Sequence, residues 1–197
     1  MARPKGTTRA KKPILKQEFE RLIRATNNSL ELQYGTKAKL TRAFTLLYLT
    51  GCRVSEIINF SSRDIEEMIQ NNEYSLSNST KTKSARLITF DSEKRQAELL
   101  KKILPSSDGY LFAKNNSTKP MSVDSLKLMM NNFIHKVLGK YYSTHSFRSG
   151  YITMAHQMNL SLEHIRQDIG HKDIATTARY ATVTNEEISH GKTKRAW

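Results

Sequence analysis

The chain has few of the residues that build disulfide scaffolds, metal sites or membrane spans. Its 197 residues contain one cysteine, Cys52, which excludes an internal disulfide and a cysteine-rich zinc site. No apolar stretch approaches the roughly 20 residues of a membrane-spanning helix, and the basic, polar start lacks the hydrophobic segment of a secretory signal. We therefore expect an intracellular, soluble protein in which Cys52, directly after an apolar run, is a buried structural thiol.

Acidic residues are also scarce relative to basic ones. The sequence has 18 Asp and Glu against 32 Lys and Arg, a formal net charge of +14, and a pI near 9.9. Such an excess suits a polyanionic partner such as nucleic acid, although charge alone leaves open a basic protein with no such role. With 38% hydrophobic residues the chain should still fold, most simply as one domain.

The first 12 residues carry basic side chains and no acidic ones. We expect this segment to be a flexible arm that becomes ordered on an anionic partner. A solvated tail and the remnant of a longer chain remain open as alternatives. The candidate nucleic-acid contacts of the arm are Arg3, Lys5, Arg9, Lys11 and Lys12.

Hydrophobic periodicity predicts a mainly α fold with a small antiparallel β-sheet. Apolar residues three or four apart predict helices from Pro13 onward and over residues 36–49, 54–58, 93–103 and 122–138. Residues 62–92 are interpreted instead as a hairpin or three-stranded sheet, with residues 86–90 as the best strand. Capping residues predict the C-terminal helices: one from Ser143 or Thr144 to about Met158, one from Ser161 to Gly170, and one after Asp173 that carries Tyr180.

Several polar residues stand out, and each has an ordinary structural explanation when taken alone. His145 and Arg148 lie three apart on a predicted helix, so both can reach one anion, yet most such pairs are surface contacts. A surface ion pair, a structural histidine, a half-buried tyrosine or an exposed lysine would explain the others. These others are Arg53 with Glu56, Lys81, His171 and Tyr180.

Taken together, the same residues form a consistent chemical set. A tyrosine hydroxyl titrates near ~10 and is a poor nucleophile at neutral pH. It becomes effective when cationic donors hold the electrophile and stabilise the charge that develops. The chain places basic groups in order upstream of Tyr180, which follows His171 by nine residues.

Three sequence boxes carry a resemblance to a known family. Residues 46–58 (LLYLTGCRVSEII) contain a Thr-Gly-x-Arg-x-Ser-Glu pattern, residues 144–148 (THSFR) a His-x-x-Arg box, and residues 169–180 (IGHKDIATTARY) a Gly-His box followed by Thr-Thr and Tyr. In this order and spacing, the boxes resemble the catalytic domain of the tyrosine recombinases, the phage integrase family. The resemblance covers roughly residues 13–190 and implies that family's mainly helical α+β fold.

The resemblance implies roles for the phosphate-holding residues. Arg53 and Arg148 would grip the non-bridging oxygens of the scissile phosphate, as planar forks suited to bidentate contact. His145 would donate a hydrogen bond to the phosphate and help to handle the tyrosine proton. His171 would be a further phosphate contact, and Glu56 would orient its basic neighbours.

The resemblance also implies the covalent chemistry. Tyr180 would attack phosphorus to give a 3′-phosphotyrosyl link, and Lys81 would protonate the departing 5′-oxygen. Lys83 is the alternative general acid, but Lys81 has the family's spacing of five residues before the arginine of the next strand, Arg86. The covalent link conserves the energy of the phosphodiester bond, so no ATP is expected. Cationic side chains would neutralise the charge on the phosphate, so no metal or other cofactor is expected either.

The implied partner is double-stranded DNA, bound by a tetramer on two sites, with no membrane involved. We expect a basic arm at residues 1–12, a catalytic domain at 13–182, and a tail at 183–197 that is either exchanged between protomers or folded back. Most family members carry a preceding helical domain, so the chain is either an excised fragment or similar in length to the short fimbrial-switch invertases. The expected compartment is the cytoplasm, nucleoid-associated in a bacterium, or the host compartment of a mobile element.

Two other functions remain open at this point. A type IB topoisomerase or a telomere resolvase would use almost the same residues, although the short chain and box spacing favour a site-specific recombinase for integration, excision or inversion. A non-catalytic DNA-binding accessory protein is the alternative of another class. The presence of every expected catalytic residue argues against it.

Overall fold

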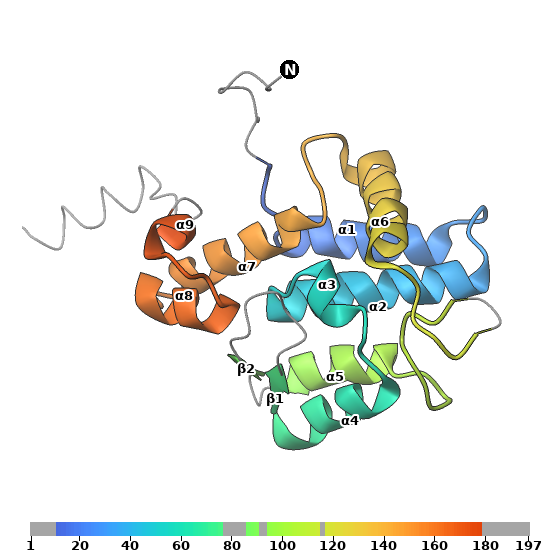
Figure 1. The fold of residues 1–197 in the computed structure, drawn as a ribbon. Coiled ribbons are helices and arrows are strands. Elements are labelled where there is room, and N and C mark those ends of the chain that lie inside the picture. The colour runs from blue at the N-terminus through green and yellow to red at the C-terminus, as the bar shows by residue number, and fades with distance from the viewer. Residues whose placement is uncertain (1–10, 77–85, 91–93, 115–116, 179–197) are drawn as a thin grey trace, which may run out of the picture.

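The fold is built around one central helix, α2 (Tyr34–Thr50), with α1 (Lys16–Asn28) beside it (Figure 1). The computed structural model describes residues 11–76, 86–90, 94–114 and 117–178. The other elements are α3 (Val54–Ile57), α4 (Ser62–Asn71), β1 (Glu73–Leu76), β2 (Arg86–Thr89), α5 (Lys94–Ile103), α6 (Val123–Leu138), α7 (His145–Gln157), α8 (Leu162–Ile169) and α9 (Ile174–Ala178). This confirms the predicted fold class, mainly α with a small antiparallel sheet.

The second half of α2 is buried on all sides, because its run of apolar residues leaves no polar face. The ring of Phe44 stacks on Phe147 of α7 at 5.6 Å between centroids and lies 6.1 Å from Phe133 of α6. α2 ends at Gly51, whose φ of 60° is left-handed and whose N–H donates to the Leu47 carbonyl at 3.1 Å. The last turn of α2 is therefore fixed in the middle of the core, where the chain turns into α3.

The two strands pair antiparallel, from Glu73 opposite Thr89 to Leu76 opposite Arg86. The strand predicted at residues 86–90 is confirmed, and the described residues contain no third strand. Side chains of β2 alternate, so Arg86 and Ile88 are buried while Leu87 and Thr89 are exposed. An arginine therefore points inward at a position where a strand normally has an apolar residue.

Helix α4 corrects the sequence interpretation of residues 62–92, which placed sheet where the chain begins with a helix. Ser61 caps it: the Ser61 hydroxyl accepts from Asp64 N–H, and the Asp64 carboxylate accepts from Ser61 N–H at 2.6 Å. Ile65 and Met68 are buried three apart on one face. The helix ends at Asn72, which has a left-handed φ of 54°.

The chain enters the described region against the start of α7. Ile14 N–H donates to the Ser146 carbonyl at 2.9 Å, and Lys12 N–H donates to the Tyr141 carbonyl at 3.0 Å. Gly150 makes this approach possible, because a Cβ there would lie 1.9 Å from the Ile14 carbonyl oxygen. Any larger residue at position 150 would push the segment around Ile14 away from α7.

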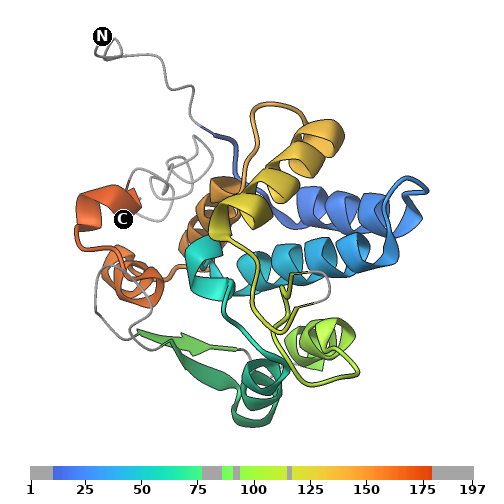
Figure 2. The ribbon, with the colours of Figure 1, turned by 45° about the vertical axis from the view of Figure 1, so that its right-hand side comes forward.

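The three C-terminal helices α7, α8 and α9 gather at one end of the molecule (Figures 1 and 2). Ser161 caps α8 by accepting from His164 N–H at 3.2 Å, and Gly170 ends it with a φ of 65°, both as predicted. The predicted hydroxyl cap of α7 is wrong. The Thr144 hydroxyl makes no capping bond, and Thr144 N–H instead donates to the Asn131 side-chain oxygen of α6 at 2.9 Å.

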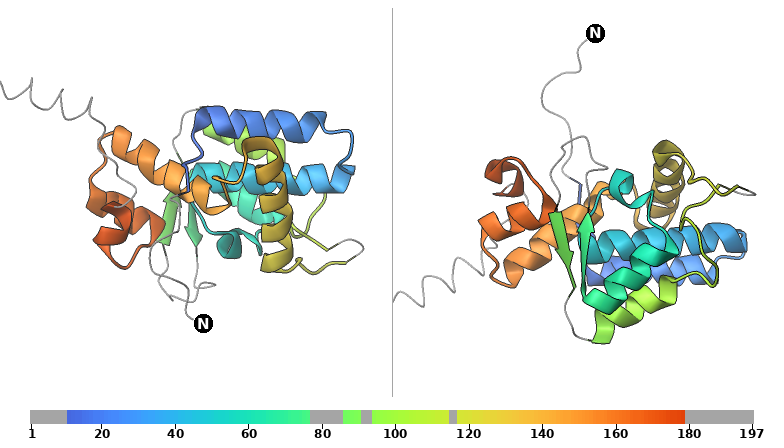
Figure 3. Two further views of the ribbon diagram at one scale, coloured as in Figure 1. Left: turned by 90° about the horizontal axis from the view of Figure 1, so that it is seen from above. Right: turned by 60° about the horizontal axis from the view of Figure 1, so that its bottom comes forward.

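Figure 3 shows the sheet lying between this end of the molecule and the pair α4 and α5. Residue 86 therefore opens β2 close to α8, while β1 continues directly from α4. None of the helices in the described ranges has the length and apolar composition needed to span a membrane. Within the same ranges, no three histidine, cysteine or acidic side chains converge as a metal site would require.

Candidate active site

A small cleft of about 110 Å³ lies where α2 ends, between α3 and the first turns of α6 and α7. Three predicted catalytic residues line it: Arg53, His145 and Arg148. Arg53 and Arg148 are far apart in sequence, so the fold brings the first two sequence boxes together. Lys127 of α6 also lines the cleft and adds a further cation to it.

The Arg148 guanidinium forms the back of the cleft and is only 5% exposed. Its Nη1 donates to the Gly51 carbonyl at 2.9 Å, its Nη2 to the Ile169 carbonyl, and its Nε to His171 Nε2 at 3.2 Å. All three acceptors are neutral. Because a guanidinium has five N–H groups, these bonds leave two N–H groups for a ligand in the cleft.

Arg148 is therefore a buried cation among other cations. Burial, followed by the charges of Arg53 and Arg86, lowers its pKa to about 10, against the opposite effect of the Glu56 carboxylate. At neutral pH it stays protonated. A buried charge is costly unless it is paired, so this site favours an anionic ligand that would supply the missing negative charge.

His171 supports Arg148 as a neutral imidazole. An arginine Nε–H can only donate, so His171 Nε2 must accept, and the ring proton lies on Nδ1. Nδ1 then donates to the Thr177 hydroxyl at 2.9 Å. Burial, followed by the charges of Arg148 and Arg53, lowers the His171 pKa to about 4. The structure shows His171 hydrogen-bonded to Arg148. The predicted contact of His171 with a phosphate stays a prediction.

Arg53 is held by the carboxylate of Glu56 at the start of α3. Glu56 accepts from Arg53 N–H at 2.6 Å through one oxygen and from Arg53 Nη1 at 3.1 Å through the other. Burial opposes ionisation of Glu56, which is 3% exposed, but the charge of Arg86 and the bond from Arg53 N–H outweigh it and lower its pKa. The Arg53 side chain keeps 38% exposure at the cleft. This contact is what the predicted orienting role of Glu56 requires.

His145 begins α7 at the edge of the cleft. Its side chain is partly exposed, yet desolvation of the covered part lowers its pKa, and the charges of Lys127, Arg53 and Arg148 act in the same sense. At neutral pH it is therefore an uncharged imidazole. Such a group can accept a proton from an attacking hydroxyl, and it can also donate a hydrogen bond.

The other predicted site residues lie away from the cleft or outside the described residues. Lys11 Nζ donates to the Lys140 carbonyl at 2.9 Å, and Lys12 Nζ lies 5.9 Å from the centre of the Tyr141 ring. The candidates outside the described residues are Arg3, Lys5, Arg9, Lys81, Lys83 and Tyr180.

Sequence reasoning did not assign two residues that the structure brings to the site. Arg86 was used only to place Lys81, although its place in the strand alternation, in phase with Ile88 and Phe90, indicates a charged side chain on the buried face. Lys127 carries no such signal. Only the packing of α6 against α3 and α7 places it at the cleft.

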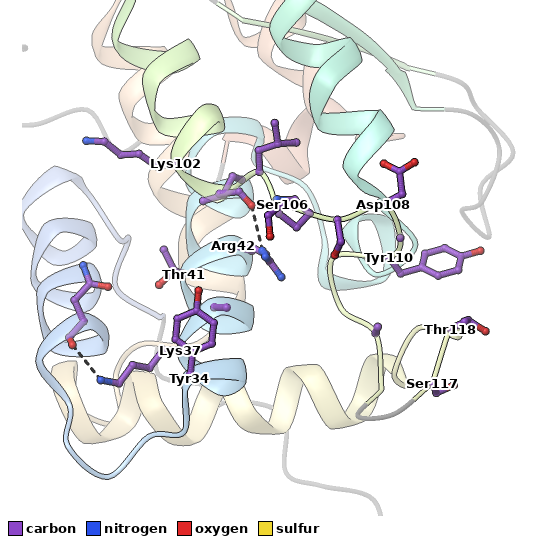
Figure 4. Close-up of a pocket in the computed structure, with 18 residues that line it drawn as sticks. Tyr34, Lys37, Thr41, Arg42, Lys102, Ser106, Asp108, Tyr110, Ser117 and Thr118 are labelled. Atoms are coloured by element: carbon purple, nitrogen blue, oxygen red, sulfur yellow. Dashed lines mark hydrogen bonds between the residues drawn. The ribbon is translucent and has the colours of Figure 1, made fainter.

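A much larger cavity, of about 860 Å³, lies along the first half of α2 (Figure 4). Arg42 within it donates through Nε to the Ile103 carbonyl at 3.1 Å and through Nη1 to the Leu111 carbonyl at 3.3 Å. None of the predicted catalytic residues lines this cavity. Size therefore does not identify the functional site. The predicted residues Arg53, His145 and Arg148, which meet at the smaller cleft, identify it.

Solved structures share the fold. The structure of XerA recombinase aligns with a TM-score of 0.70 at 19% identity, over 100% of this chain and 67% of that chain. The Tn1549 transposon integrase, solved in complex with transposon right end DNA, gives a TM-score of 0.73 at 17% identity, over 98% and 69% respectively. The chain thus has the fold that these two structures share.

The sequence then fixes the family. Residues 12–187 match the model of the phage integrase family, and the chain belongs to that family. The tyrosine recombinase XerC of Staphylococcus saprophyticus is 27% identical over 146 residues, which are 73% of this chain and 49% of that protein. XerD of Halalkalibacterium halodurans is 26% identical over 190 residues, 94% of this chain and 62% of that protein. The chain thus spans roughly half the length of the curated relatives it matches.

Proposed function

We propose that this chain is the catalytic part of a site-specific DNA recombinase that cuts and rejoins strands through a 3′-phosphotyrosyl intermediate. One observation carries the proposal. Arg148 is a buried cation with neutral hydrogen-bond partners, and it shares one small cleft with Arg53 and His145. Such a cleft suits the two non-bridging oxygens of a phosphodiester, which share its negative charge.

Each residue then has a step in the reaction. The Tyr180 hydroxyl oxygen forms a bond to phosphorus while the bond from phosphorus to the 5′-oxygen breaks. Neutral His145 accepts the tyrosine proton, and Lys81 gives a proton to the departing 5′-oxygen. Arg53 and Arg148 stabilise the additional charge on the non-bridging oxygens. Rejoining runs the same steps in reverse from a second 5′-hydroxyl.

The grip on DNA is the second part of the proposal. Lys12, at the end of the predicted basic arm (residues 1–12), donates through its N–H to the Tyr141 carbonyl. Ile14 N–H donates to the carbonyl of Ser146, directly after His145. Phosphate contacts by Arg3, Lys5 and Arg9 would there add to affinity and to its salt dependence. We further propose assembly as a homotetramer on two duplexes.

A nicked duplex that traps the covalent intermediate tests the proposal. The substrates are duplexes with randomised sequence and those taken from inverted repeats that flank the gene. The full chain should form a DNA adduct that survives SDS, and Tyr180→Phe should form none. If the full chain forms no adduct with either set of duplexes, the enzyme assignment fails and a non-catalytic DNA-binding role takes its place.

The identity of the general acid has its own test. Lys81→Ala should cleave ordinary DNA poorly and should recover on a substrate with sulfur at the 5′-bridging position, because a thiolate leaves without needing a proton. Lys83→Ala is the matched control and should cleave both substrates as the unmodified chain does. The reverse pattern would assign the role to Lys83.

A further inference from the structure

Arg86 lies at the junction between the two halves of the candidate site. It opens β2, points inward and is 9% exposed. Its Nη2 donates to Glu56 Oε2 at 3.1 Å and to Cys52 Sγ at 3.0 Å, and its Nη1 donates to the Asp168 carbonyl of α8. One guanidinium therefore touches the start of α3, the end of α2 and the end of α8.

On the α3 side, Arg86 acts on the carboxylate that holds Arg53. Glu56 Oε2 accepts from both Arg86 Nη2 and Arg53 N–H, while Oε1 accepts from Arg53 Nη1. Without Arg86, this 3% exposed carboxylate would lose a charged partner and the contact that fixes its plane. The orientation of the Arg53 guanidinium at the cleft depends on that plane.

On the α8 side, Arg86 stabilises the turn that leads into His171. The last carbonyl groups of a helix lack partners within the helix. Here Arg86 satisfies that of Asp168, and Arg148 satisfies that of Ile169. Gly170 leaves the necessary room, because a Cβ there would lie 3.2 Å from Arg86 Cδ.

Stability alone explains this residue poorly. The Arg86 Nε atom is buried and has no hydrogen-bond partner among the described residues. A buried charge network with an unsatisfied N–H is usually no more stabilising than apolar residues of similar volume. The geometry of the fork, which spans Glu56 and the Asp168 carbonyl at once, is what an apolar or shorter residue could not reproduce.

We propose that Arg86 is a positioning residue of the active site. It fixes the position of Glu56 and Arg53 relative to the end of α8, which leads into His171. The inference rests on the proposed function and deepens it. Arg86 acts through Arg53, Arg148 and His171 rather than on the phosphate. Its loss therefore slows strand cleavage without weakening DNA binding in proportion, because a small misplacement of catalytic groups is costly for rate.

The test compares Arg86→Lys with Arg42→Lys in the full chain. Lysine keeps the charge but cannot span two acceptors in a fixed plane. Arg42 is the matched control, because it is partly buried, also donates to two partners and does not line the cleft. The readouts are the single-turnover rate of adduct formation on saturating nicked duplex, the dissociation constant for the same DNA, and the melting temperature.

For Arg86→Lys we expect cleavage slower by about 100-fold, with DNA affinity within about threefold and melting lowered no more than in Arg42→Lys. Arg42→Lys should cleave at the unmodified rate. Unchanged cleavage in Arg86→Lys, or an equal loss in Arg42→Lys, would overturn the inference. If the unmodified chain itself forms no adduct, the proposed function fails and this inference falls with it.

A double-variant cycle decides the matter if Arg86→Lys does not fold. Glu56→Gln combined with Arg86→Gln removes both buried charges together and avoids leaving one of them unpaired. Because Arg86 acts partly through Glu56, the loss of cleavage rate in the double variant should be smaller than the product of the losses in Glu56→Gln and Arg86→Gln. Independent, multiplying losses in the double variant would contradict the proposed path.

Discussion

Arg42 and Arg148 make the same kind of hydrogen bonds in different electrostatic surroundings. Each donates to two backbone carbonyl groups, and burial lowers the pKa of each. Around Arg42, the other charge effect on its pKa comes from Tyr34 and raises it. Around Arg148, the cations Arg53 and Arg86 lower it further. Arg148 therefore lies in a cluster where the charges of two arginines act against that of one carboxylate, Glu56, whereas no described cation contributes to the lowered pKa of Arg42.

The same contrast holds between the two cavities. The one of about 860 Å³ at Arg42 is lined by Lys37 and Lys102 and also by the acidic Asp108 (Figure 4). The one of about 110 Å³ at Arg148 is small, and two arginines, a lysine and a histidine line it without any acidic side chain from the part of the chain that the structure describes. The smaller cavity is therefore the one whose lining is cationic throughout its charged positions.

The largest expected effect is the difference in cleavage rate between variants of the two arginines. Arg148→Lys should slow adduct formation by about 10²–10³-fold, because one preorganised donor to the transition state is lost. Arg42→Lys should leave the rate unchanged and lower only the melting temperature. Single-turnover cleavage of nicked duplex measures both. Equal losses in the two variants would mean that the difference in their surroundings has no functional meaning.

The next effect concerns pH. The unfolded chain protonates His171 below about 6.5, whereas the folded chain resists until about 4. The free energy of unfolding should therefore fall as pH drops through this window, by on the order of 3 kcal/mol from this residue. His145 acts in the same sense, and Asp168, whose pKa is raised by burial, acts against it.

Urea unfolding at several pH values between 7 and 4 measures this effect. His171→Gln should flatten the dependence of stability on pH. His135→Gln, which replaces an exposed histidine of α6, is the control and should leave the dependence as it is. A flattening of equal size in both variants would remove His171 as the cause.

A smaller effect distinguishes the glycines at the two ends of α2. At Gly51, with a φ of 60°, a Cβ would lie 2.8 Å from the Tyr151 ring, so Gly51→Ala should destabilise the fold by about 1–3 kcal/mol. At Gly35 a Cβ meets nothing within 4 Å, so Gly35→Ala should be neutral or stabilising by up to about 0.5 kcal/mol. Thermal melting of both variants checks the contrast. An equal melting temperature for the two variants would show that the C-terminal end of α2, at Gly51, is not tightly fixed.

The smallest expected change is a difference in thiol reactivity. Cys52 is 2% exposed, and burial raises its pKa to about 11. In the native chain it should react with an aromatic disulfide reagent at least about 100-fold more slowly than in denaturant. A Ser117→Cys substitution at the far cavity, in a Cys52→Ala background, should react promptly because residue 117 is exposed. Prompt labelling of native Cys52 would contradict the burial of this side chain beside the cleft.

The sequence was most informative where local pattern and chemistry agree. The helix stop at Gly170, the cap at Ser161 and the shared face of His145 and Arg148 depend on neighbours in the chain, and the structure confirms each. Helix α4 was missed, although Ser61 and Asp64 form a capping box. Its apolar residues Ile65, Met68 and Ile69 also have helical spacing, so the helix was predictable from the sequence.

The contacts that complete the site depend on residues far apart in the chain. Tertiary packing alone determines three of these contacts. They are the hydrogen bond from Arg148 to His171, the bond from the start of α7 to Asn131, and the bond from Arg86 to the end of α8. Composition and spacing predict which residues take part in such a site. Which of these residues hydrogen-bonds to which becomes visible only in the three-dimensional structure.

The most direct test of the central claim is to map the DNA-linked peptide after trapping on a nicked duplex. The account predicts that digestion and mass spectrometry of the SDS-stable adduct place the 3′-phosphate on Tyr180, and that Arg148→Lys reduces the yield while Arg42→Lys does not. A phosphate attached to any other residue, or an adduct that forms equally well in Tyr180→Phe, would contradict it.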